Sequence, residues 1–244
     1  MAPASTNFET PSLTMLWQVF HIKNIWQAFI LSGSPEMGQY MTANNSIKVR
    51  FISCGIFQPE LEQVLGQIQA DHLFNCVFEV RYLKAGLHSD LDALKKEMVN
   101  SLNLDGDERT IFLYGSKCHP ELDAILDRYP VVRFNQDNCI PLLTGENTYG
   151  KNAKTFFLTT GWILKWKEIF DSITGLDESA VRQSFGLCDR VIFKNTNIQD
   201  ISEEALLELF EYTGCPIEIE DIGLDLFKKN IIGALEQVLN QCRA

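Results

Sequence analysis

The sequence predicts an α/β protein in which helices cover both faces of a mainly parallel β-sheet, forming a three-layer sandwich. From Ile47 onward, short β-branched and aromatic runs alternate with longer helical patterns, which is typical of βαβ units. Of the 244 residues, 45% are hydrophobic and 22% are charged, as in ordinary globular proteins, and a chain of this length buries a substantial core. Right-handed crossovers between successive parallel strands then place the helices on the two faces.

Strands and helices are expected to alternate along most of the chain. The strands fall near residues 47–53, 77–83, 110–115, 131–134 and 190–194. The helices fall near residues 59–70, 89–102, 120–129, 160–174, 177–185, 201–213 and 222–241. Pro59 and Pro120 stand in the first turns of their helices, where a missing N–H is tolerated, and Asp200 with Glu203 has the spacing of a helix-capping pair.

Two segments of the chain resemble each other, which is compatible with two repeated βαβ units. Residues 51–65 (FISCGIFQPELEQVL) align without gaps on residues 112–126 (FLYGSKCHPELDAIL), with the first Phe, the Pro-Glu-Leu helix start and the final Leu in common. After each helix comes a strand with the pattern Val-Arg-aromatic, at residues 80–82 and 132–134. The alternative is that strand–loop–helix units reuse the same local chemistry without duplication.

Residues 1–40 are expected to form an N-terminal extension beside a single α/β domain of residues 41–244. Residues 1–12 are small, polar and proline-containing, and residues 13–31 are apolar-rich but interrupted by polar and charged side chains. We therefore expect an amphipathic helix that packs on the domain or on a partner, and no membrane span or signal peptide. Met41, which precedes a short polar lead into the first strand, is an alternative natural start.

Charge and cysteine content narrow the partners and the compartment. The chain has 21 Lys and Arg against 32 Asp and Glu, a net charge of −11, which argues against a nucleic acid partner because neutralising phosphates supplies most of that affinity. Its seven cysteines are odd in number and lack the short regular spacings of a secreted disulfide framework. We therefore predict that the protein lies in the reducing cytoplasm, where cysteines serve as ligands, nucleophiles or core residues.

The strongest candidate site consists of four residues that each follow a strand. Cys54 ends the first expected strand, His88 lies in the loop after the second, Cys118 lies in the loop after the third, and Cys139 follows the fourth. The carboxyl ends of parallel strands share one edge, which is where open α/β folds bind ligands. Three thiolates and one imidazole suit a tetrahedral zinc ion or, with one position open, a catalytic zinc or another thiophilic metal. No CxxC motif is present, so the site rests on topology, and small buried core residues are the alternative.

Neighbouring residues are candidates for supporting roles. His119 adjoins Cys118 and can replace it as a ligand or orient one. Asp137, which lies two residues before Cys139, can orient a ligating histidine or act as an acid–base group. The alternative is that Asp137 is a solvated acidic residue of the loop without a role in the site. Because Cys118 is expected at a helix N-terminus, we expect a lowered thiol pKa there, which would make it a nucleophile with His88 or His119 as its base.

The other motifs are assigned structural roles. Residues 144–162 contain three glycines but lack both the GxGxxG and the GxxxxGK[ST] spacing, so no nucleotide-phosphate site is predicted. Trp162 and Trp166 are expected to pack in the core or at its rim, with a stacking platform for a planar ligand as the alternative. His72 is expected on the surface at a helix end. The cysteines treated as structural are Cys76, Cys188, Cys215 and Cys242.

The motifs after the strands resemble those of the family of domains of unknown function numbered sixteen thirty-eight. They are, in order, CGIFQPEL, LH, YGSKC, DNCIPLLTG and FFLTTGW, and the resemblance covers about residues 47–235. The family pattern falls on Cys54 with Gly55, Leu87 with His88, Tyr114 with Gly115 and Cys118, Cys139 with Gly145, and Leu158, Thr159 and Gly161 with Trp162.

Two departures from the family pattern occur at the site. The spacing from Tyr-Gly to Cys118 is one residue longer, with His119 in place of Gly, and Asn138 replaces the Asp before Cys139. The resemblance implies that the four candidate ligands act together and that Tyr114 and Trp162 lie near the metal or substrate. Such families sometimes accompany genes of corrinoid-dependent methyl transfer, so the resemblance strengthens the site without supplying a reaction. Together with the ligand types, that company makes thiol or methyl-group transfer a hypothesis, with zinc as the expected cofactor and an iron–sulfur cluster or a corrinoid as alternatives.

Three classes of function follow from these observations. The first is a cytoplasmic metal-binding protein with a Cys/His site, zinc being the expected ion. The second is a metal-free thiol enzyme with Cys118 or Cys54 as nucleophile and His88 as base. The third is a non-enzymatic accessory module in which the N-terminal helix and the Trp162 edge contact a partner.

Overall fold

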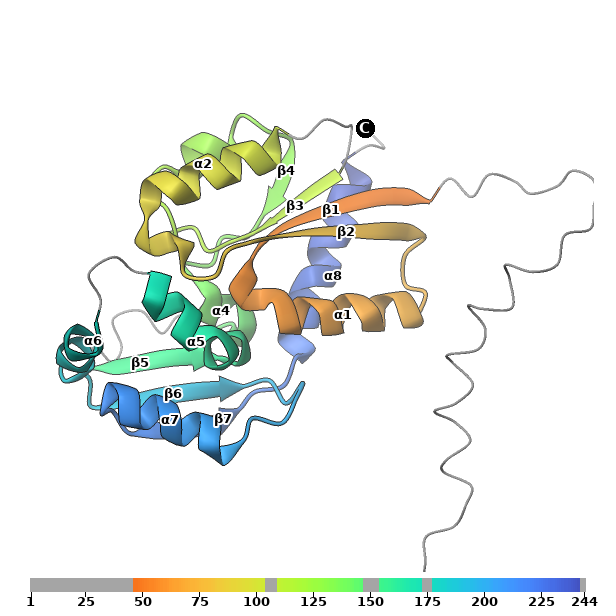
Figure 1. The fold of residues 1–244 in the computed structure, drawn as a ribbon. Helices are drawn as coiled ribbons and strands as arrows, with labels where there is room; N and C mark the ends of the chain where they lie inside the picture. The colour runs from red at the N-terminus through yellow and green to blue at the C-terminus, as the bar shows by residue number, and fades with distance from the viewer. Residues whose placement is uncertain (1–45, 104–108, 147–153, 173–176, 242–244) are drawn as a thin grey trace, which may run out of the picture. The chain divides into compact units, whose positions relative to one another are not determined.

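The structure, a computed structural model, describes residues 46–103, 109–146, 154–172 and 177–241 (Figure 1). Strands and helices alternate through these residues, and every recorded strand pairing is parallel, which confirms the α/β class. The strands form two sheets. The helix expected within residues 1–40 lies outside the described residues, as does Cys242.

The first sheet has the strand order β2-β1-β3-β4. Its strands are β1 (Ile47–Cys54), β2 (Cys76–Leu83), β3 (Arg109–Leu113) and β4 (Val131–Arg133). β1 and β3 lie in the centre and are buried on both faces, as their near-continuous apolar runs require. In the register, Cys54 is level with Leu83 and Ser53 is level with Leu113, so the carboxyl ends of the first three strands meet at one edge.

Helices cover both faces of the first sheet, so this part of the chain is a three-layer sandwich (Figure 1). On one face lie α1 (Gln58–Ala70) and α8 (Asp225–Asn240), whose core includes Val49 and Phe51 of β1. On the other face lie α2 (Leu91–Leu102) and α3 (Leu122–Leu126), which pack with Ile52. Successive side chains of a strand point to opposite faces, so β1 contributes to both cores.

The second sheet has the order β5-β6-β7 and follows the short helix α4 (Cys139–Thr144). Its strands are β5 (Thr155–Thr159), β6 (Arg190–Asn195) and β7 (Ile217–Asp221). The helices α5 (Thr160–Ser172), α6 (Glu178–Phe185) and α7 (Glu203–Thr213) share a separate core with this sheet. Leu158, Phe193 and Trp166 are buried in it.

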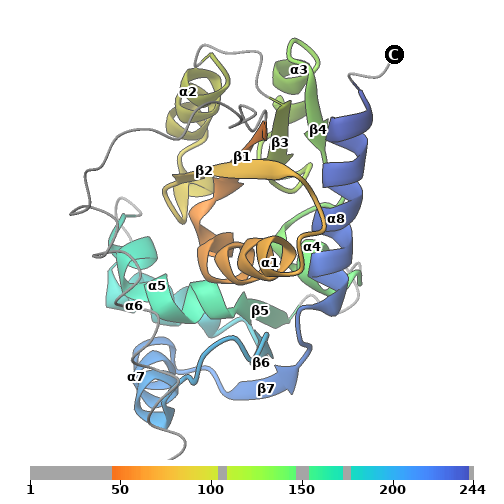
Figure 2. The same cartoon turned by 90° about the vertical axis from the view of Figure 1, so that its right-hand side faces the viewer.

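Helix α8 follows the last strand of the second sheet but packs on the first. Figure 2 shows it running beside β4 and α4. Its side chains Phe227, Ile231 and Leu235 are fully buried in the core of the first sheet. The ring of Phe227 stacks on that of Phe57, with centroids 5.5 Å apart.

Several expected elements need correction. The five expected strands are confirmed as β1 to β4 and β6, but β5 and β7 were not predicted, and neither was α4. Pro59 is confirmed near the start of α1, whereas α3 begins only at Leu122 and Pro120 precedes it. The cap of α7 is Ser202, whose side chain accepts a hydrogen bond from the Ala205 N–H, so the Asp200 cap was wrong.

None of the helices within the described ranges has both the length and the apolar character that crossing a bilayer requires.

The two segments that align in sequence take equivalent places in the first sheet. Each runs from a strand through a turn into a helix, from β1 into α1 and from β3 into α3, but α3 has only 5 residues against 13 in α1.

Candidate functional site

A cavity of about 650 Å³ opens at the carboxyl edge of the first sheet. Its lining includes all four residues predicted as ligands: Cys54, His88, Cys118 and Cys139. We refer to Cys54, Cys118 and Cys139 as the cavity cysteines. The expectation that parallel topology gathers these residues at one edge therefore agrees with the geometry, although they come from four separate segments of the chain.

Local backbone features bring the four segments together. Cys54 is the last residue of β1, and His88 lies in a short 3₁₀ helix (Leu87–Ser89) after β2. Gly86, which precedes that turn, has a φ of 77°, a left-handed conformation that glycine adopts readily. A Cβ on Gly86 would also lie 2.8 Å from the Ile169 side chain of α5, so this turn is pressed closely against a helix of the second sheet.

The turn after β3 is pressed equally closely against the segment that carries Cys139. A Cβ at Gly115 would lie 2.3 Å from the Cα of Asn138, so only glycine fits this approach. Backbone hydrogen bonds from Ser116 to Gln136 and from Lys117 to Asp137, at 2.8 and 3.0 Å, join the two segments. Because Gly115 allows this close approach, Cys118 and Cys139 line the same cavity.

Asn138 caps α4 and so orients Cys139, the first residue of that helix. Its side chain accepts a hydrogen bond of 3.0 Å from the Ile140 N–H. Asparagine and aspartate are equally good at this position of a helix, so Asn138 keeps the structural role that Asp would have in the family pattern.

The cavity cysteines are protonated at neutral pH. Burial raises the pKa of Cys54, raises that of Cys118 to about 11, and raises that of Cys139 well above its ordinary value. Negative charge on Cys54 raises the pKa of both other thiols further. The expected lowering of the Cys118 pKa by a helix N-terminus was wrong, because α3 begins only at Leu122 and burial dominates.

Hydrogen-bond donors lie beside all three sulfur atoms, and the donor beside Cys118 is the Gly115 backbone. The Ile56 backbone and the Tyr114 hydroxyl lower the pKa of Cys54, and Trp162 lowers that of Cys139, but in both cases by less than burial raises it. The Tyr114 side chain is buried against Phe112, with ring centroids 5.2 Å apart, and its hydroxyl makes no hydrogen bond of normal geometry. Tyr114 thus lies beside the sulfur atom of Cys54, and Trp162 lies beside that of Cys139.

His88 presents a neutral imidazole to the cavity. Burial lowers its pKa from the ordinary value, so the ring carries no charge at neutral pH. The ring meets Trp162 edge-on, with centroids 6.3 Å apart. A neutral imidazole is the form that ligates a metal or accepts a proton.

The remaining lining of the cavity divides into an apolar wall and a polar rim. Phe156 and Phe157 of β5, together with Trp162, form much of the apolar wall. At the rim Asp137 forms an ion pair with Lys117, with Nζ 2.7 Å from the carboxylate oxygen. Asp137 thus lines the cavity, but its recorded partner is Lys117 and not His88.

The donor set suits a thiophilic metal, since three thiols and a neutral imidazole share one cavity. Among the residues that the structure describes, however, no group of three or more His, Cys, Asp or Glu side chains is arranged to hold a metal ion. The types of donor suit such an ion, although their present arrangement does not hold one.

Several sequence candidates lie outside the cavity. His119 is buried, its Nδ1 accepts a hydrogen bond of 3.0 Å from the Glu121 N–H, and it is absent from the lining. Trp166 is buried in the second core, and His72 is exposed in a left-handed turn after α1. The cysteines of the described residues are all free, and those outside the cavity are Cys76, Cys188 and Cys215.

Sequence reasoning missed the wall contributed by β5. The run TFFLT at residues 155–159 is aromatic and β-branched, which is a strand signal, but it stands next to a polar, glycine-containing segment and was read with it. Sequence reasoning also missed Glu60, a fully buried carboxylate on α1, since a single Glu in the first turn of a helix is ordinarily exposed.

Comparison with known proteins identifies a family and two distant structural likenesses. The family model described as "Protein of unknown function (DUF1638)" matches residues 82–231. No curated protein sequence matches the chain.

Two solved structures are similar to this one at low identity. The transcription regulator CcpA of Lactococcus lactis is 12% identical with a TM-score of 0.38, covering 80% of this chain and 92% of that one. A carbohydrate transporter from Acidothermus cellulolyticus 11B, in complex with myo-inositol, is 13% identical with a TM-score of 0.30, covering 72% and 73%.

Proposed function

Since this chain belongs to the DUF1638 family of proteins of unknown function, we propose that it is a metal-binding protein that holds a zinc ion through the cavity cysteines and His88. The observation that carries the proposal is the convergence of four soft or borderline donors, from four separate segments, on one cavity of about 650 Å³. Core cysteines without a shared role have no reason to meet in this way.

The electrostatics of the thiols also support a cation. Ionised Cys54 raises the pKa of Cys118 and of Cys139, ionised Cys118 raises that of Cys139 further, and Lys165 lowers the pKa of Cys54 by less than burial raises it. The Lys165 ammonium is bound to the Gly55 carbonyl at 3.1 Å and to the Gln58 side chain at 2.9 Å. A soft dication in the cavity would remove the mutual repulsion and deprotonate the thiols that it binds.

The chemistry of such a site is that of an activated sulfur. Bound zinc keeps a coordinated thiol ionised at neutral pH, which makes that sulfur a nucleophile. Tyr114 and Trp162 would hold the sulfur atoms of Cys54 and Cys139 in place, and the phenylalanines of β5 would exclude water beside them. Thiol or methyl-group transfer to a small substrate in the cavity is the reaction class that this arrangement favours.

The metal-free alternative is less well supported. A cysteine nucleophile needs a lowered pKa, and burial raises the pKa of all three cavity cysteines. His88 is neutral and able to accept a proton, but no hydrogen bond between it and a cavity cysteine is recorded. An accessory module that uses the Trp162 edge for a partner remains as the function if the cavity binds no ion.

Zinc titration of the full chain, purified without oxygen and stripped with a chelator, tests the proposal. We expect one tightly bound equivalent, measured against a chromophoric chelator, and strong loss of binding in Cys54→Ser and Cys139→Ser. The matched controls are Cys76→Ser and Cys188→Ser, which change free cysteines outside the cavity and should bind as the wild type does. Circular dichroism of each variant confirms that it is folded.

Three results would overturn the zinc assignment or its ligands. No stoichiometric binding in the wild type would remove the metal altogether. Iron and sulfide in a brown protein, lost in the same two variants, would keep the residues but replace zinc by an iron–sulfur cluster. Equal loss of binding in the control variants would show that the cavity cysteines are not the ligands.

A further inference from the structure

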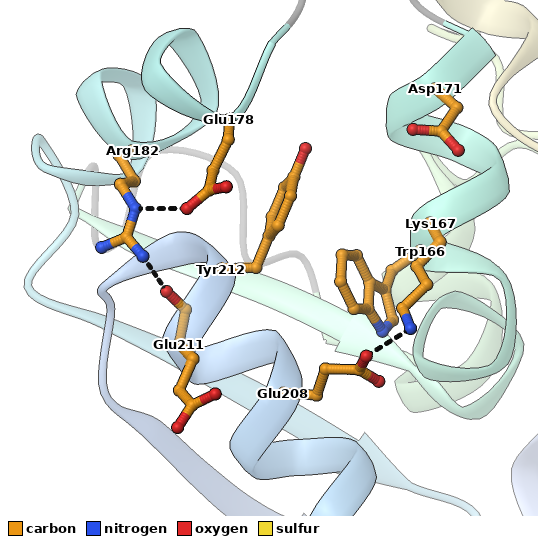
Figure 3. A pocket seen from close by; sticks show the side chains of 8 residues that line it. All are labelled: Trp166, Lys167, Asp171, Glu178, Arg182, Glu208, Glu211 and Tyr212. Atoms are coloured by element: carbon orange, nitrogen blue, oxygen red, sulfur yellow. Dashed lines mark hydrogen bonds and ion pairs between the residues drawn. The ribbon is translucent and has the colours of Figure 1, made fainter.

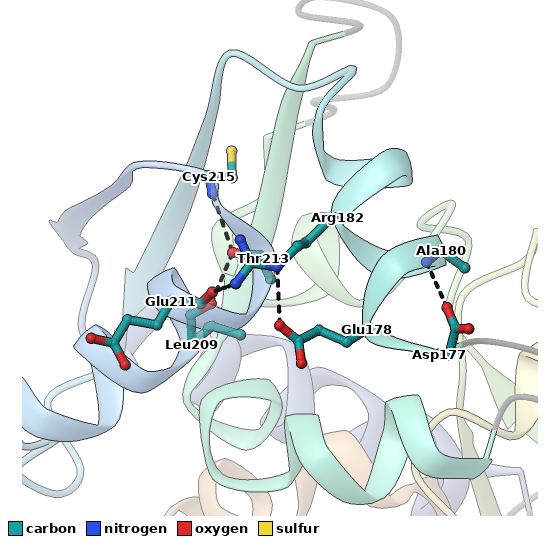
Figure 4. Close-up of polar contacts among 8 residues, drawn as sticks. All are labelled: Asp177, Glu178, Ala180, Arg182, Leu209, Glu211, Thr213 and Cys215. Carbon is teal, nitrogen blue, oxygen red and sulfur yellow. Dashed lines mark hydrogen bonds and ion pairs between the residues drawn. The ribbon is translucent and has the colours of Figure 1, made fainter.

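One buried side chain at the contact between α1 and α5 lacks the kind of partner that polar groups between other helices have. Lys167 of α5, for comparison, forms an ion pair with Glu208 of α7 (Figure 3). At the end of α7, the Thr213 hydroxyl donates a hydrogen bond of 2.8 Å to the Leu209 carbonyl (Figure 4). Glu60 of α1 is fully buried, but among the described residues neither of its carboxyl oxygens has a hydrogen-bond partner of normal geometry. A buried acid of this kind is costly to ionise, so its charge state matters to the structure around it.

Helix α5 is pressed against the 3₁₀ turn Gly55–Phe57, which joins β1 to α1 and which we call the β1–α1 turn. A Cβ on Gly161, the second residue of α5, would lie 1.8 Å from the Ile56 carbonyl oxygen, so only glycine allows this approach. Figure 2 shows α5 passing beside the start of α1. The turn is thus fixed by a helix of the second sheet as well as by its own strand.

Lys165 adds a polar link between the same two elements. It lies one helical turn after Gly161, on the same face of α5. Its ammonium donates to the Gly55 carbonyl at 3.1 Å and to the Gln58 side-chain oxygen at 2.9 Å. The Gln58 N–H donates to the same Gly55 carbonyl. Lys165 therefore holds the β1–α1 turn through two neutral oxygen atoms.

The β1–α1 turn forms part of the cysteine cavity. Cys54 directly precedes the turn, and Ile56 and Phe57 within it line the cavity. Phe156 and Trp162, which also line the cavity, come from β5 and α5. Both elements that Lys165 joins therefore contribute to the wall of the cavity, and a shift of the turn changes its shape.

The surroundings of Glu60 contain one basic side chain that acts on it within the described part of the chain. Burial raises the pKa of Glu60 from 4.5 to about 7, although backbone N–H groups, the Thr196 hydroxyl and Lys165 lower it in part. On β2, burial and the charges of Glu62 and Glu60 raise the pKa of Tyr82, so its hydroxyl stays uncharged at neutral pH. Glu62 is exposed on α1. Both charge states of Glu60 are therefore populated near neutral pH, and Lys165 is the group that can compensate its charge.

The two charge states of Glu60 place different demands on Lys165. When Glu60 is protonated, the ammonium is satisfied by the Gly55 and Gln58 oxygens. When Glu60 is ionised, a buried carboxylate lies in the field of that ammonium, and charge-assisted hydrogen bonds are about twice as strong as those to neutral oxygens. The carboxylate then competes for the ammonium, and the long, flexible lysine side chain can turn toward it.

We propose that Glu60 and Lys165 form a proton-controlled switch that sets the shape of the cysteine cavity. With Glu60 protonated, Lys165 holds the β1–α1 turn and the cavity has the form described above. Loss of the proton to solvent draws the ammonium to Glu60, which releases the Gly55 carbonyl and loosens the turn that follows Cys54. The switch concerns the shape of the cavity, so it does not depend on which ligand the cavity binds.

Hydrogen exchange of the metal-free full chain, measured by mass spectrometry on residues 51–58 with a thiol reductant present, tests this inference. Rates between about pH 5.5 and about pH 8.5 are divided by the intrinsic exchange rate of an unprotected amide at each pH, which gives a protection factor. We expect protection of the wild-type turn to fall about threefold to tenfold as the pH rises, with a midpoint near 7, because Glu60 ionises there. Glu60→Gln, which cannot ionise, should keep its protection throughout. The matched control is Glu62→Gln, an exposed change on the same helix that should behave as the wild type does.

Lys165→Met tests whether the ammonium carries the effect. This variant keeps an apolar stem and removes the charge, so the turn should be less protected than in the wild type at low pH. Its protection should then not change further as the pH rises. Circular dichroism shows whether the variant is folded, and Lys165→Gln, which is also uncharged, replaces it if it is not.

Any of three results would contradict the switch. One is constant protection of the wild-type turn over this pH range. Another is a pH effect that persists without the Lys165 ammonium, which would leave Glu60 acting by another route. The third is a parallel loss of protection in α2, which would show that ionisation weakens the whole fold and not the turn. Because no metal is present in the measurement, its outcome is independent of the zinc titration.

Discussion

The buried carboxyl group of Glu60 should make the stability of the protein depend on pH in an unusual direction. Glu60 lies in the first turn of α1, is fully buried, and neither of its carboxyl oxygens makes a hydrogen bond of normal geometry. Burial raises its pKa from 4.5 to about 7, although the backbone of Gly161 and the Thr196 hydroxyl, which are nearby, lower it in part. The folded protein therefore holds this proton more tightly than the unfolded chain does.

The sign and size of the effect follow from that difference. The stabilising contribution is fully present below the unfolded pKa and is lost as the pH rises through the folded value of about 7. Each pKa unit corresponds to about 1.4 kcal/mol, so the free energy of unfolding should fall by roughly 3 kcal/mol between about pH 4.5 and pH 8 from this group alone. Because the side chain is fully buried, solvent screening does not reduce this value substantially.

Glu60→Gln removes the ionisation and nearly conserves the shape. We expect the difference in unfolding free energy between this variant and the wild type to grow in favour of Gln as the pH rises from 5 to 8. Urea unfolding at fixed ionic strength, with a thiol reductant present, measures it. Glu62→Gln, an exposed change two residues along the same helix, is the control. A difference between Glu60→Gln and the wild type that stays constant across this range would refute the reasoning.

Three further predictions concern single residues. Alkylation of Cys118 in the metal-free protein near pH 7 should be about tenfold slower than that of a free thiol, because a pKa of about 11 lowers the thiolate fraction more than it raises the nucleophilicity of the thiolate. A rate equal to or above that of a free thiol would instead favour the metal-free enzyme in which Cys118 is the nucleophile. Gly161→Ala should destabilise the fold by more than about 3 kcal/mol in thermal or urea unfolding, because the added Cβ would lie 1.8 Å from the Ile56 carbonyl oxygen, and a loss below 1 kcal/mol would contradict the packing. Ser202→Ala should cost about 1 kcal/mol in the same assay by removing the cap on the Ala205 N–H, whereas no loss would mean that water replaces the cap.

The first sheet could be predicted well from the sequence because its signals are strong and local. β1 and β3 are apolar on both faces and are followed by helical patterns, and parallel topology then gathers their carboxyl ends. The second sheet was harder. β7 alternates isoleucine with acidic residues and is mostly exposed, so its composition resembles that of a loop as much as a strand.

Topology predicted which residues share the cavity, but not their chemical state. The low pKa expected for Cys118 depended on a helix that starts at residue 120, two residues before the observed start at Leu122, and on exposure that the folded chain does not provide. The orientation of His119 depends on a side-chain rotamer and on the nearby Glu121 N–H, which no sequence pattern reveals. The contact between Trp166 and Tyr212 likewise joins α5 and α7, which are separated by α6 and β6 in the chain.

The return of α8 to the first sheet has a consequence for how the protein is made. During synthesis, the apolar face of β1 and β3 emerges early, while Phe227, Ile231 and Leu235, which complete its core, are added only after the whole second sheet. Folding in step with translation therefore cannot finish the first sheet before the second exists. The nascent chain has to keep an exposed apolar face out of contact with other chains for that interval, which makes chaperone binding during translation more important than it would be for two independent domains in series.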